Sequence, residues 1–156
     1  MNNSIVVRRL KQDDIELFHE TVRVLKPSVS RHTCGTHARA WLARSSNVLV
    51  AATKKDVPVG FALGYLLDRI DSANPMLFFY EIEVAESFRQ CGIGRCLVEA
   101  MKQVAKDARV VKMWVQTDPG NSVAQALYRK TGGHEAATSD SLYTWTDHAL
   151  TDEDVS

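Results

Sequence analysis

The residues best suited to chemistry lie in one short stretch near the middle of the chain. Glu81 and Glu83 stand two positions apart on an expected strand, where a carboxylate can take a proton from a substrate. The helix that follows is expected to open at about Ile93, in a turn that carries Gly92 and Gly94. Glycines at a helix N-terminus let an anionic group approach bare backbone N–H donors. An acid–base group beside an anion-binding turn indicates a group-transfer enzyme.

The two glutamates need partners, because an unpaired buried charge is costly. Residues two apart on a strand share a face. Alternation therefore predicts Phe79, Glu81 and Glu83 on one face of the strand expected over residues 76–84. One interpretation is structural, with ion pairs to Arg or Lys side chains of a neighbouring strand. The other is functional, with one carboxylate as the base for an amine or hydroxyl substrate. The residues alone leave both open.

The glycine turn matches other binding loops only in part. The segment from Gly92 to Leu97 has two glycines of a dinucleotide fingerprint, but Leu97 stands in place of the third. A Gly-Lys-Ser/Thr phosphate-binding loop does not occur in the sequence. Cys91 and Cys96 lack the second Cys/His pair that would complete a zinc site, so no metal is expected.

Hydrophobic spacing and turn residues predict the elements that position this stretch. Early strands pair as hairpins and later strands alternate with helices, which predicts an α/β fold with a mixed sheet. One domain is expected over residues 1–156, with a loose acidic tail at about 150–156. The expected strands cover residues 4–9, 47–53, 57–67, 76–84, 110–116 and 141–146, and the expected helices are one capped by Asp13 or Asp14 and ended by Pro27, one over 36–44, one from about 93 and one over 121–130.

Composition narrows the class of protein. The 19 basic and 19 acidic residues balance, and the basic ones are scattered, so no nucleic-acid partner is expected. No apolar run approaches the roughly 18 residues that span a bilayer, so no membrane partner is expected. An odd number of cysteines and an N-terminus without a signal pattern favour a cytoplasmic protein with reduced thiols.

Two segments carry a resemblance to a known family. Arg89-x-x-Gly92-x-Gly94, after the strand that contains Glu81, closely resembles the acetyl-coenzyme A signature of the GCN5-related N-acetyltransferases, the GNAT superfamily. The segment from Asp118 to Gly132 looks like the second cofactor segment of that family. Together the likeness covers roughly residues 48–133.

A narrower resemblance points to one subfamily. The segments over residues 80–84 and 126–130 are similar to aminoglycoside 3-N-acetyltransferases. In that subfamily the position of Glu81 is usually an aspartate, so this chain departs by one methylene. The fold implied is GNAT-like, a mixed and mostly antiparallel central sheet flanked by helices on both faces.

The resemblance implies acetyl-CoA as cofactor, with coenzyme A as product. The pyrophosphate would rest on backbone N–H groups at the start of the helix, and the pantetheine arm would extend the sheet beside Ile82 and Val84. Val84 is the implied oxyanion donor. Asn121 would contact the cofactor arm or cap the next helix, and both roles stay open. The implied cofactor-binding positions are Ile82, Val84, Arg89, Gln90, Cys91, Gly92, Ile93, Gly94, Arg95, Asn121, Ala124 and Tyr128.

The resemblance also implies direct transfer without a covalent enzyme intermediate. Glu81 is the first candidate for the base and Glu83 the second. Tyr128 would protonate the departing thiolate, the alternative being a buried core tyrosine. Beyond the two glutamates, three aspartates are candidates for holding a cationic acceptor, namely Asp68, Asp118 and Asp140.

The expected activity is acetylation of the 3-amino group of an aminoglycoside antibiotic, as in a resistance enzyme. The rivals are acetylation of a protein, a peptide or a polyamine, and a non-catalytic acyl-CoA-binding module. The expected partner is a small cationic amine, and whether the chain forms a homodimer stays open.

Overall fold

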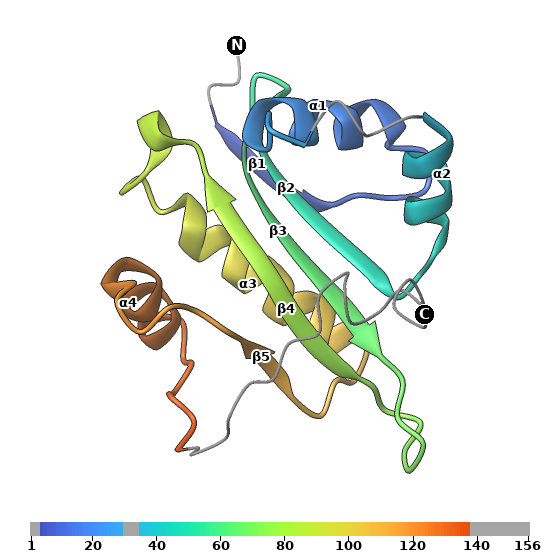
Figure 1. Cartoon of the computed structure of the whole chain (residues 1–156), viewed down its shortest axis with the longest axis vertical. Coiled ribbons are helices and arrows are strands. Elements are labelled where there is room, and N and C mark those ends of the chain that lie inside the picture. The colour runs from blue at the N-terminus through green and yellow to red at the C-terminus, as the bar shows by residue number, and fades with distance from the viewer. Residues whose placement is uncertain (1–3, 30–34, 138–156) are drawn as a thin grey trace, which may run out of the picture.

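The computed structural model describes residues 4–29 and 35–137 (Figure 1). The expected strand over residues 141–146, the candidate Asp140 and the acidic tail lie outside the described residues. The elements in chain order are β1 (Ile5–Arg9), α1 (Ile15–Leu25), α2 (Gly35–Ala43), β2 (Asn47–Lys54), β3 (Val57–Leu67), β4 (Met76–Val84), the 3₁₀ turn η2 (Glu86–Phe88), α3 (Ile93–Asp107), β5 (Met113–Val115) and α4 (Ser122–Lys130).

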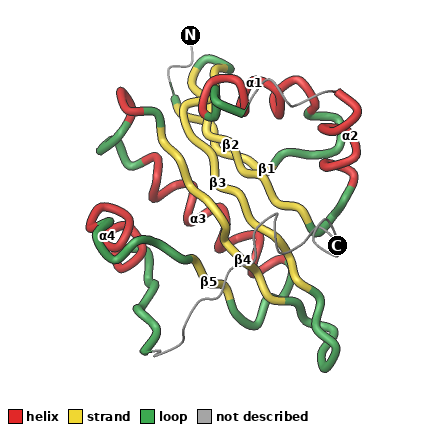
Figure 2. The backbone as a smooth tube through the Cα atoms, in the orientation of Figure 1, coloured by secondary structure: helices red, strands yellow, loops and turns green. Residues whose placement is uncertain are grey.

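The five strands form one sheet in the order β1-β2-β3-β4-β5. Neighbours pair antiparallel from β1 to β4, and β5 joins β4 in parallel. Helices α1 and α2 cover one face, and α3 runs across the other (Figures 1 and 2). This arrangement confirms the expected mixed, mostly antiparallel sheet with helices on both faces.

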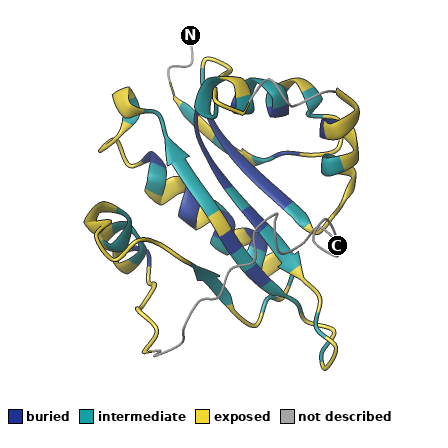
Figure 3. Ribbon diagram, viewed as in Figure 1, coloured by how far each residue is buried: buried dark blue, intermediate teal, exposed yellow. Residues whose placement is uncertain are grey.

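Alternating side chains of the sheet form two cores, one on each face. On β2, for example, Val48 and Val50 pack with the α3 side, while Leu49 packs with the side of α1 and α2. The buried residues run along β2 and β3 and along the inner side of α3 (Figure 3). Because both faces of the central strands are covered, β4 is held firmly at its start.

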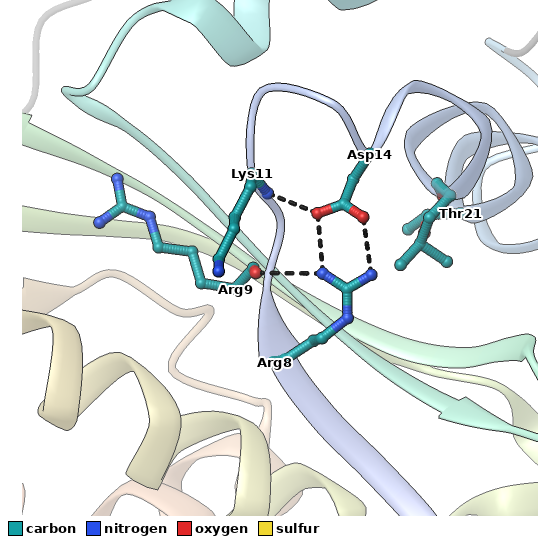
Figure 4. Close-up of polar contacts among 6 residues, drawn as sticks. Arg8, Arg9, Lys11, Asp14 and Thr21 are labelled. Carbon is teal, nitrogen blue, oxygen red and sulfur yellow. Dashed lines mark hydrogen bonds and ion pairs between the residues drawn. The ribbon is translucent and has the colours of Figure 1, made fainter.

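The connection from β1 to α1 is fastened by a carboxylate. Asp14 accepts two hydrogen bonds of 2.7 Å from the Arg8 guanidinium and one of 2.6 Å from the Lys11 backbone N–H (Figure 4). Asp14 stands at the predicted N-cap position of α1, but its side chain makes no hydrogen bond to the first turn of the helix. The position of the cap is therefore as predicted, and the predicted side-chain capping bond is wrong. The Arg8 hydrogen bonds lower the pKa of Asp14 to about 2.

The strand expected over residues 110–116 is shorter in the structure, because the turn that ends α3 extends into it. Arg109 takes a left-handed φ of 55°, and the Val110 N–H bonds back to Ala105 O at 2.8 Å. Only Met113–Val115 then pairs with β4. Among the described residues, no helix is long and apolar enough to cross a bilayer.

Candidate active site

Strand β4 loses its outer neighbour halfway along its length. It pairs with β5 only from Leu77–Met113 to Phe79–Val115, and β5 then leaves toward α4 (Figure 1). From Glu81 to Val84, β4 pairs with β3 alone among the described residues, and Tyr80 pairs with neither neighbour. We call this stretch, residues 80–84, the open edge of β4.

A β-bulge lies where the open edge begins. Leu63 pairs with Glu81 and Gly64 with Phe79, so Tyr80 is an extra residue that has no partner on β3. An extra residue reverses the alternation that follows it. The predicted shared face of Phe79, Glu81 and Glu83 is therefore wrong.

The faces of β4 after the bulge are set by their packing. Phe79 packs with Ile82 and Val84 in the core beneath α3. Glu81 and Glu83 lie opposite Leu63 and Phe61, which belong to the core beneath α1 and α2. The bulge thus places both carboxylates on the α1 side of the sheet and keeps apolar side chains against α3.

The open edge leaves backbone donors free. Ala85 donates its N–H to Val59 O at 2.9 Å, on the β3 side. Because successive N–H groups of a strand alternate in direction, those of Ile82 and Val84 point away from β3. The Val84 carbonyl, on the same side, accepts from Arg89 Nε at 3.1 Å. These N–H groups fit a ligand that adds to the sheet like a strand.

The N-terminus of α3 is a second set of free donors. The first helical bond runs from Cys96 N–H to Gly92 O, which leaves the N–H groups before it without helical partners. Gly92 has a left-handed φ of 78°, and a Cβ there would meet no atom within 4 Å. The first turn carries no acidic residue and no side-chain cap. An uncapped, open helix N-terminus suits a phosphate group.

Gly94 allows α3 to approach α4 closely. A Cβ at this position would lie 3.2 Å from Leu127 Cδ2. The close approach places the middle of α4 against the first turn of α3.

Each glutamate of β4 has a cationic partner, although neither comes from a neighbouring strand. Lys26 Nζ lies 2.7 Å from both carboxylate oxygens of Glu81. Arg89 Nη2 lies 3.4 Å from Glu83 Oε1. Lys26 is the C-cap of α1, and Arg89 follows η2. The Glu81 side chain keeps 27% of its surface exposed, so the ion pair and access from outside coexist.

Tyr128, on α4, packs on the α3 face of the sheet, opposite to the face that carries the two glutamates. Its ring meets that of Phe79 edge to face at 6.2 Å between centroids. Burial raises the pKa of the Tyr128 phenol. Its hydroxyl makes no hydrogen bond to the described residues, although its ring joins the core beneath α3. The structure therefore places the ring in the core, and the role of proton donor stays a prediction.

Three further predicted cofactor residues, Gln90, Cys91 and Asn121, lie in the turns that precede α3 and α4. Asn121 is the N-cap of α4, with Oδ1 accepting from the Ala124 N–H at 3.1 Å, so the expected cap is confirmed. Gln90 has a left-handed φ of 60° in the exposed turn. Cys91 is exposed, and its Sγ contacts Arg89 O at 3.4 Å. No cluster of metal-ligating side chains occurs in the described ranges.

The two predicted acceptor-binding aspartates that the structure describes, Asp68 and Asp118, lie in loops that follow strands. Asp68 follows the last residue of β3, at the end of the hairpin where β4 begins, and Glu81 lies well along β4. Asp118 lies in the loop between β5 and α4, where its Oδ1 accepts from the Gly120 N–H at 2.7 Å. Lys26, which contacts Glu81, was not predicted. No local pattern marks a contact made across 55 positions of sequence.

Comparison with known proteins decides the family. The family model described as "Acetyltransferase (GNAT) family" matches residues 15–133. The chain belongs to the GNAT acetyltransferase family. Acetyl-CoA is accordingly the acetyl donor, as expected, and the open edge and the α3 N-terminus fit its arm and phosphates. A search of the curated proteins gives no match.

Solved structures show how widely this GNAT fold is shared. The aminoglycoside acetyltransferase meta-AAC0020, from an uncultured soil metagenomic sample, superposes with a TM-score of 0.79 at 23% identity, covering 93% of this chain and 99% of that one. The aminoglycoside N-acetyltransferase AAC(6')-Iy gives 0.71 at 20% identity, covering 94% and 97%. The ribosomal-protein-alanine N-acetyltransferase from Brucella melitensis biovar Abortus 2308 gives 0.68 at 18% identity, covering 91% and 100%.

Proposed function

We propose that this GNAT protein transfers the acetyl group of acetyl-CoA directly to an amine of a cationic small molecule, the 3-amino group of an aminoglycoside antibiotic. The observation that carries the proposal is the open edge of β4. Free N–H groups and a partly exposed carboxylate lie along it, and the uncapped N-terminus of α3 follows it in the chain after η2. Such a segment can hold a donor on one side and receive an acceptor on the other.

Backbone donors hold the cofactor in this proposal. When bound, acetyl-CoA supplies an acetyl thioester that an amine can attack. The N–H groups from Gln90 to Arg95 bind its phosphates, assisted by the positive end of the α3 dipole. The N–H groups of Ile82 and Val84 pair with its arm, and that of Val84 stabilises negative charge on the thioester oxygen. The Asn121 amide and Ala124 border the same arm from α4.

Side chains of β4 and α4 move the protons. An ammonium has no lone pair, so Glu81 accepts a proton from the acceptor before the amine attacks. Glu83 lies two residues further along β4 on the same face, where its carboxylate stabilises positive charge on the acceptor. Tyr128 donates its phenolic proton to the departing sulfur as the C–S bond breaks, and the remaining excess proton on the amide nitrogen then returns to the Tyr128 phenolate. The Tyr128 phenol is protonated at neutral pH, and because burial raises its pKa it keeps this proton until the thiolate forms.

The acceptor class is supported by charge and by relatives. Two glutamates line the α1 side of the open edge, and Asp68, Asp118 and Asp140 are proposed to add negative charge around a polycation. Two of the similar structures are named as aminoglycoside acetyltransferases. The reaction is proposed to take place in the cytoplasm, in one domain over residues 1–156 whose free thiols Cys91 and Cys96 stay reduced.

An acceptor panel tests this function. Thiol release from acetyl-CoA is measured with aminoglycosides, spermidine and an alanine-initiated peptide, with the Glu81→Gln variant as control. We expect turnover with an aminoglycoside, and a product whose NMR spectrum carries the acetyl group on the 3-amino nitrogen. Acetylation at the 6′-amino nitrogen, the position in the name AAC(6')-Iy, would overturn the regiochemistry alone.

Peptide acetylation is the rival with an observation in its favour, since one similar structure is a ribosomal-protein-alanine N-acetyltransferase. Turnover of the peptide with silence across the aminoglycosides would select it. Binding of acetyl-CoA with no turnover of any amine would instead indicate a non-catalytic acyl-CoA-binding module.

A further inference from the structure

Lys26 places its ammonium group against Glu81, at the position that the ammonium group of the acceptor takes in the proposed reaction. Its Nζ lies 2.7 Å from both oxygens of Glu81 and 5.9 Å from the centroid of the Phe61 ring. The backbone N–H of Lys26 closes the last turn of α1 on Val22 O at 2.8 Å. The fold thus delivers a primary amine to the candidate base from a fixed helix end.

The acceptor and Lys26 compete for the same two oxygens. A base must lie within hydrogen-bond reach of the proton that it takes, so the acceptor ammonium has to contact Glu81. Both Glu81 oxygens are already engaged by Lys26, which carries the same functional group. A carboxylate has about four lone-pair sites, so a second ammonium can also reach Glu81, but it then lies beside the Lys26 ammonium, and like-charge repulsion favours displacement of Lys26.

The net charge around Glu81 affects how strongly a cationic acceptor competes with Lys26. Glu83 is paired with Arg89 through a single longer contact of 3.4 Å, so the charges of the two glutamates and their two cations sum to zero. Once displaced, the Lys26 ammonium stays within one side-chain length of Glu81, because its backbone is held by α1. It then repels an acceptor more strongly the more positive charges that acceptor carries.

Exposure keeps the displacement feasible. The side chains of Lys26 and Glu81 are 35% and 27% exposed. A partly exposed ion pair contributes little to stability, whereas a fully buried pair would be costly to break. An incoming ammonium that makes its own bonds to Glu81 can replace Lys26 at small cost.

We propose that Lys26 is an internal ammonium that occupies the acceptor position on Glu81 and sets the affinity of the site for cationic amines. This specificity-determining role rests on the proposed function, because it assumes that the acceptor amine reaches Glu81. It acts on binding of the acceptor and leaves the chemical step to Glu81.

Direct binding tests the proposal without turnover. The probes are spermidine and kanamycin, titrated by calorimetry at low salt into the cofactor-free protein, its Lys26→Met variant and a matched control, Lys102→Met. Lys102 is similarly exposed at 33% and also pairs with a glutamate, Glu99, at 3.1 Å. Both variants lose one positive charge, so the change in the net charge of the protein is the same in both.

We expect Lys26→Met to bind both probes about fivefold more tightly, and Lys102→Met to stay within about twofold of wild type. Adding Glu81→Gln to Lys26→Met should remove the gain. Equal affinities in wild type and Lys26→Met, equal gains in both lysine variants, or no measurable binding in any of them would overturn the proposal.

Kinetics with a turned-over acceptor separate this role from a merely positioning one. Displacement predicts a lower KM in Lys26→Met with kcat unchanged, and wild-type behaviour in Lys26→Arg. A lower kcat at unchanged KM would mean that Lys26 orients Glu81, and would overturn the inference. If no amine is turned over but Lys26→Met still binds the probes more tightly, the proposed function fails and the Lys26–Glu81 competition stands.

Discussion

The two halves of β4 have the same secondary structure but differ in their strand neighbours and in their burial. Leu77 and Phe79, in the first half, lie between β3 and β5 and are 0% and 1% exposed. The second half, the open edge, keeps β3 but has no strand partner on its other side among the described residues, and its side chains from Glu81 to Val84 are partly exposed. The bulge at Tyr80 marks the change.

The difference shows how one strand can be both scaffold and site. Loss of β5 frees N–H groups at Ile82 and Val84, while the side chains of these residues stay packed against α3. The backbone donors are therefore held rigidly although they have no strand partner. Site groups on regular elements are positioned more closely than groups on loops. We expect mutations in the first half to affect stability and mutations in the second half to affect turnover.

Glu81→Gln is the variant expected to have the largest effect, and it tests whether the second half of β4 serves turnover. Removing the base should lower kcat by about a thousandfold to ten-thousandfold, since general base catalysis contributes effects of this order. Binding of acetyl-CoA and the melting temperature should stay close to wild type. Steady-state kinetics and thermal unfolding measure both. If Glu83→Gln alone were crippling, the assignment of the base would be wrong.

Phe79→Ala tests the structural half. Truncating a buried phenylalanine in the α3 core should cost roughly 3–5 kcal/mol of unfolding free energy. Tyr80→Ala is the neighbouring control, and because Tyr80 is 55% exposed it should cost about 1 kcal/mol or less. Urea denaturation measures both. Equal losses would contradict the division of β4 at the bulge.

Tyr128→Phe probes the far side of the open edge with a smaller effect. The ring still packs on Phe79, but the proton donor is gone, so kcat should fall by about a hundredfold with stability unchanged. An unchanged kcat together with full stability would leave Tyr128 as a core residue only.

A large part of the fold followed from local patterns. The bounds of β3 and β4 and the start of α3 are as predicted, because apolar alternation and a glycine turn are signals within a few residues. The end of α1 before Pro27 followed in the same way.

The parts of the site that were not predictable depend on distant partners. The bulge at Tyr80 exists only in the register with β3, and it reverses the faces of Glu81 and Glu83 relative to Phe79. The contact between Lys26 and Glu81 depends on how α1 crosses the sheet. Neither the register nor the crossing is visible in the spacing of residues along the chain.

A substitution of Asp14 is expected to have the smallest effect. Like Glu81, Asp14 accepts two 2.7 Å hydrogen bonds from a cation, but its ion pair holds β1 to α1 and takes no part in the proposed reaction. The pKa of Asp14 is lowered from 3.8 to about 2, so its ion pair stabilises the fold above about pH 4 and is lost as the pH falls toward 2. Because the pair lies at the surface, we expect Asp14→Asn to cost about 1 kcal/mol at pH 6.

Urea denaturation of wild type and Asp14→Asn at several pH values measures this cost. The difference should shrink as the pH approaches 2, while turnover at neutral pH is unchanged. A difference that is independent of pH would mean that the charge of Asp14 is not what fastens β1 to α1.

The central claim, that acetyl-CoA binds along the open edge of β4 and on the α3 N-terminus, is tested most directly by a ¹H–¹⁵N NMR titration of the backbone amides with acetyl-CoA, using NAD as the control nucleotide. We predict that the largest shifts fall on Ile82, Val84 and the amides from Gln90 to Arg95, and that NAD does not reproduce those of Ile82 and Val84. Shifts confined to the α1 and α2 side of the sheet, or the same pattern with NAD, would contradict the account.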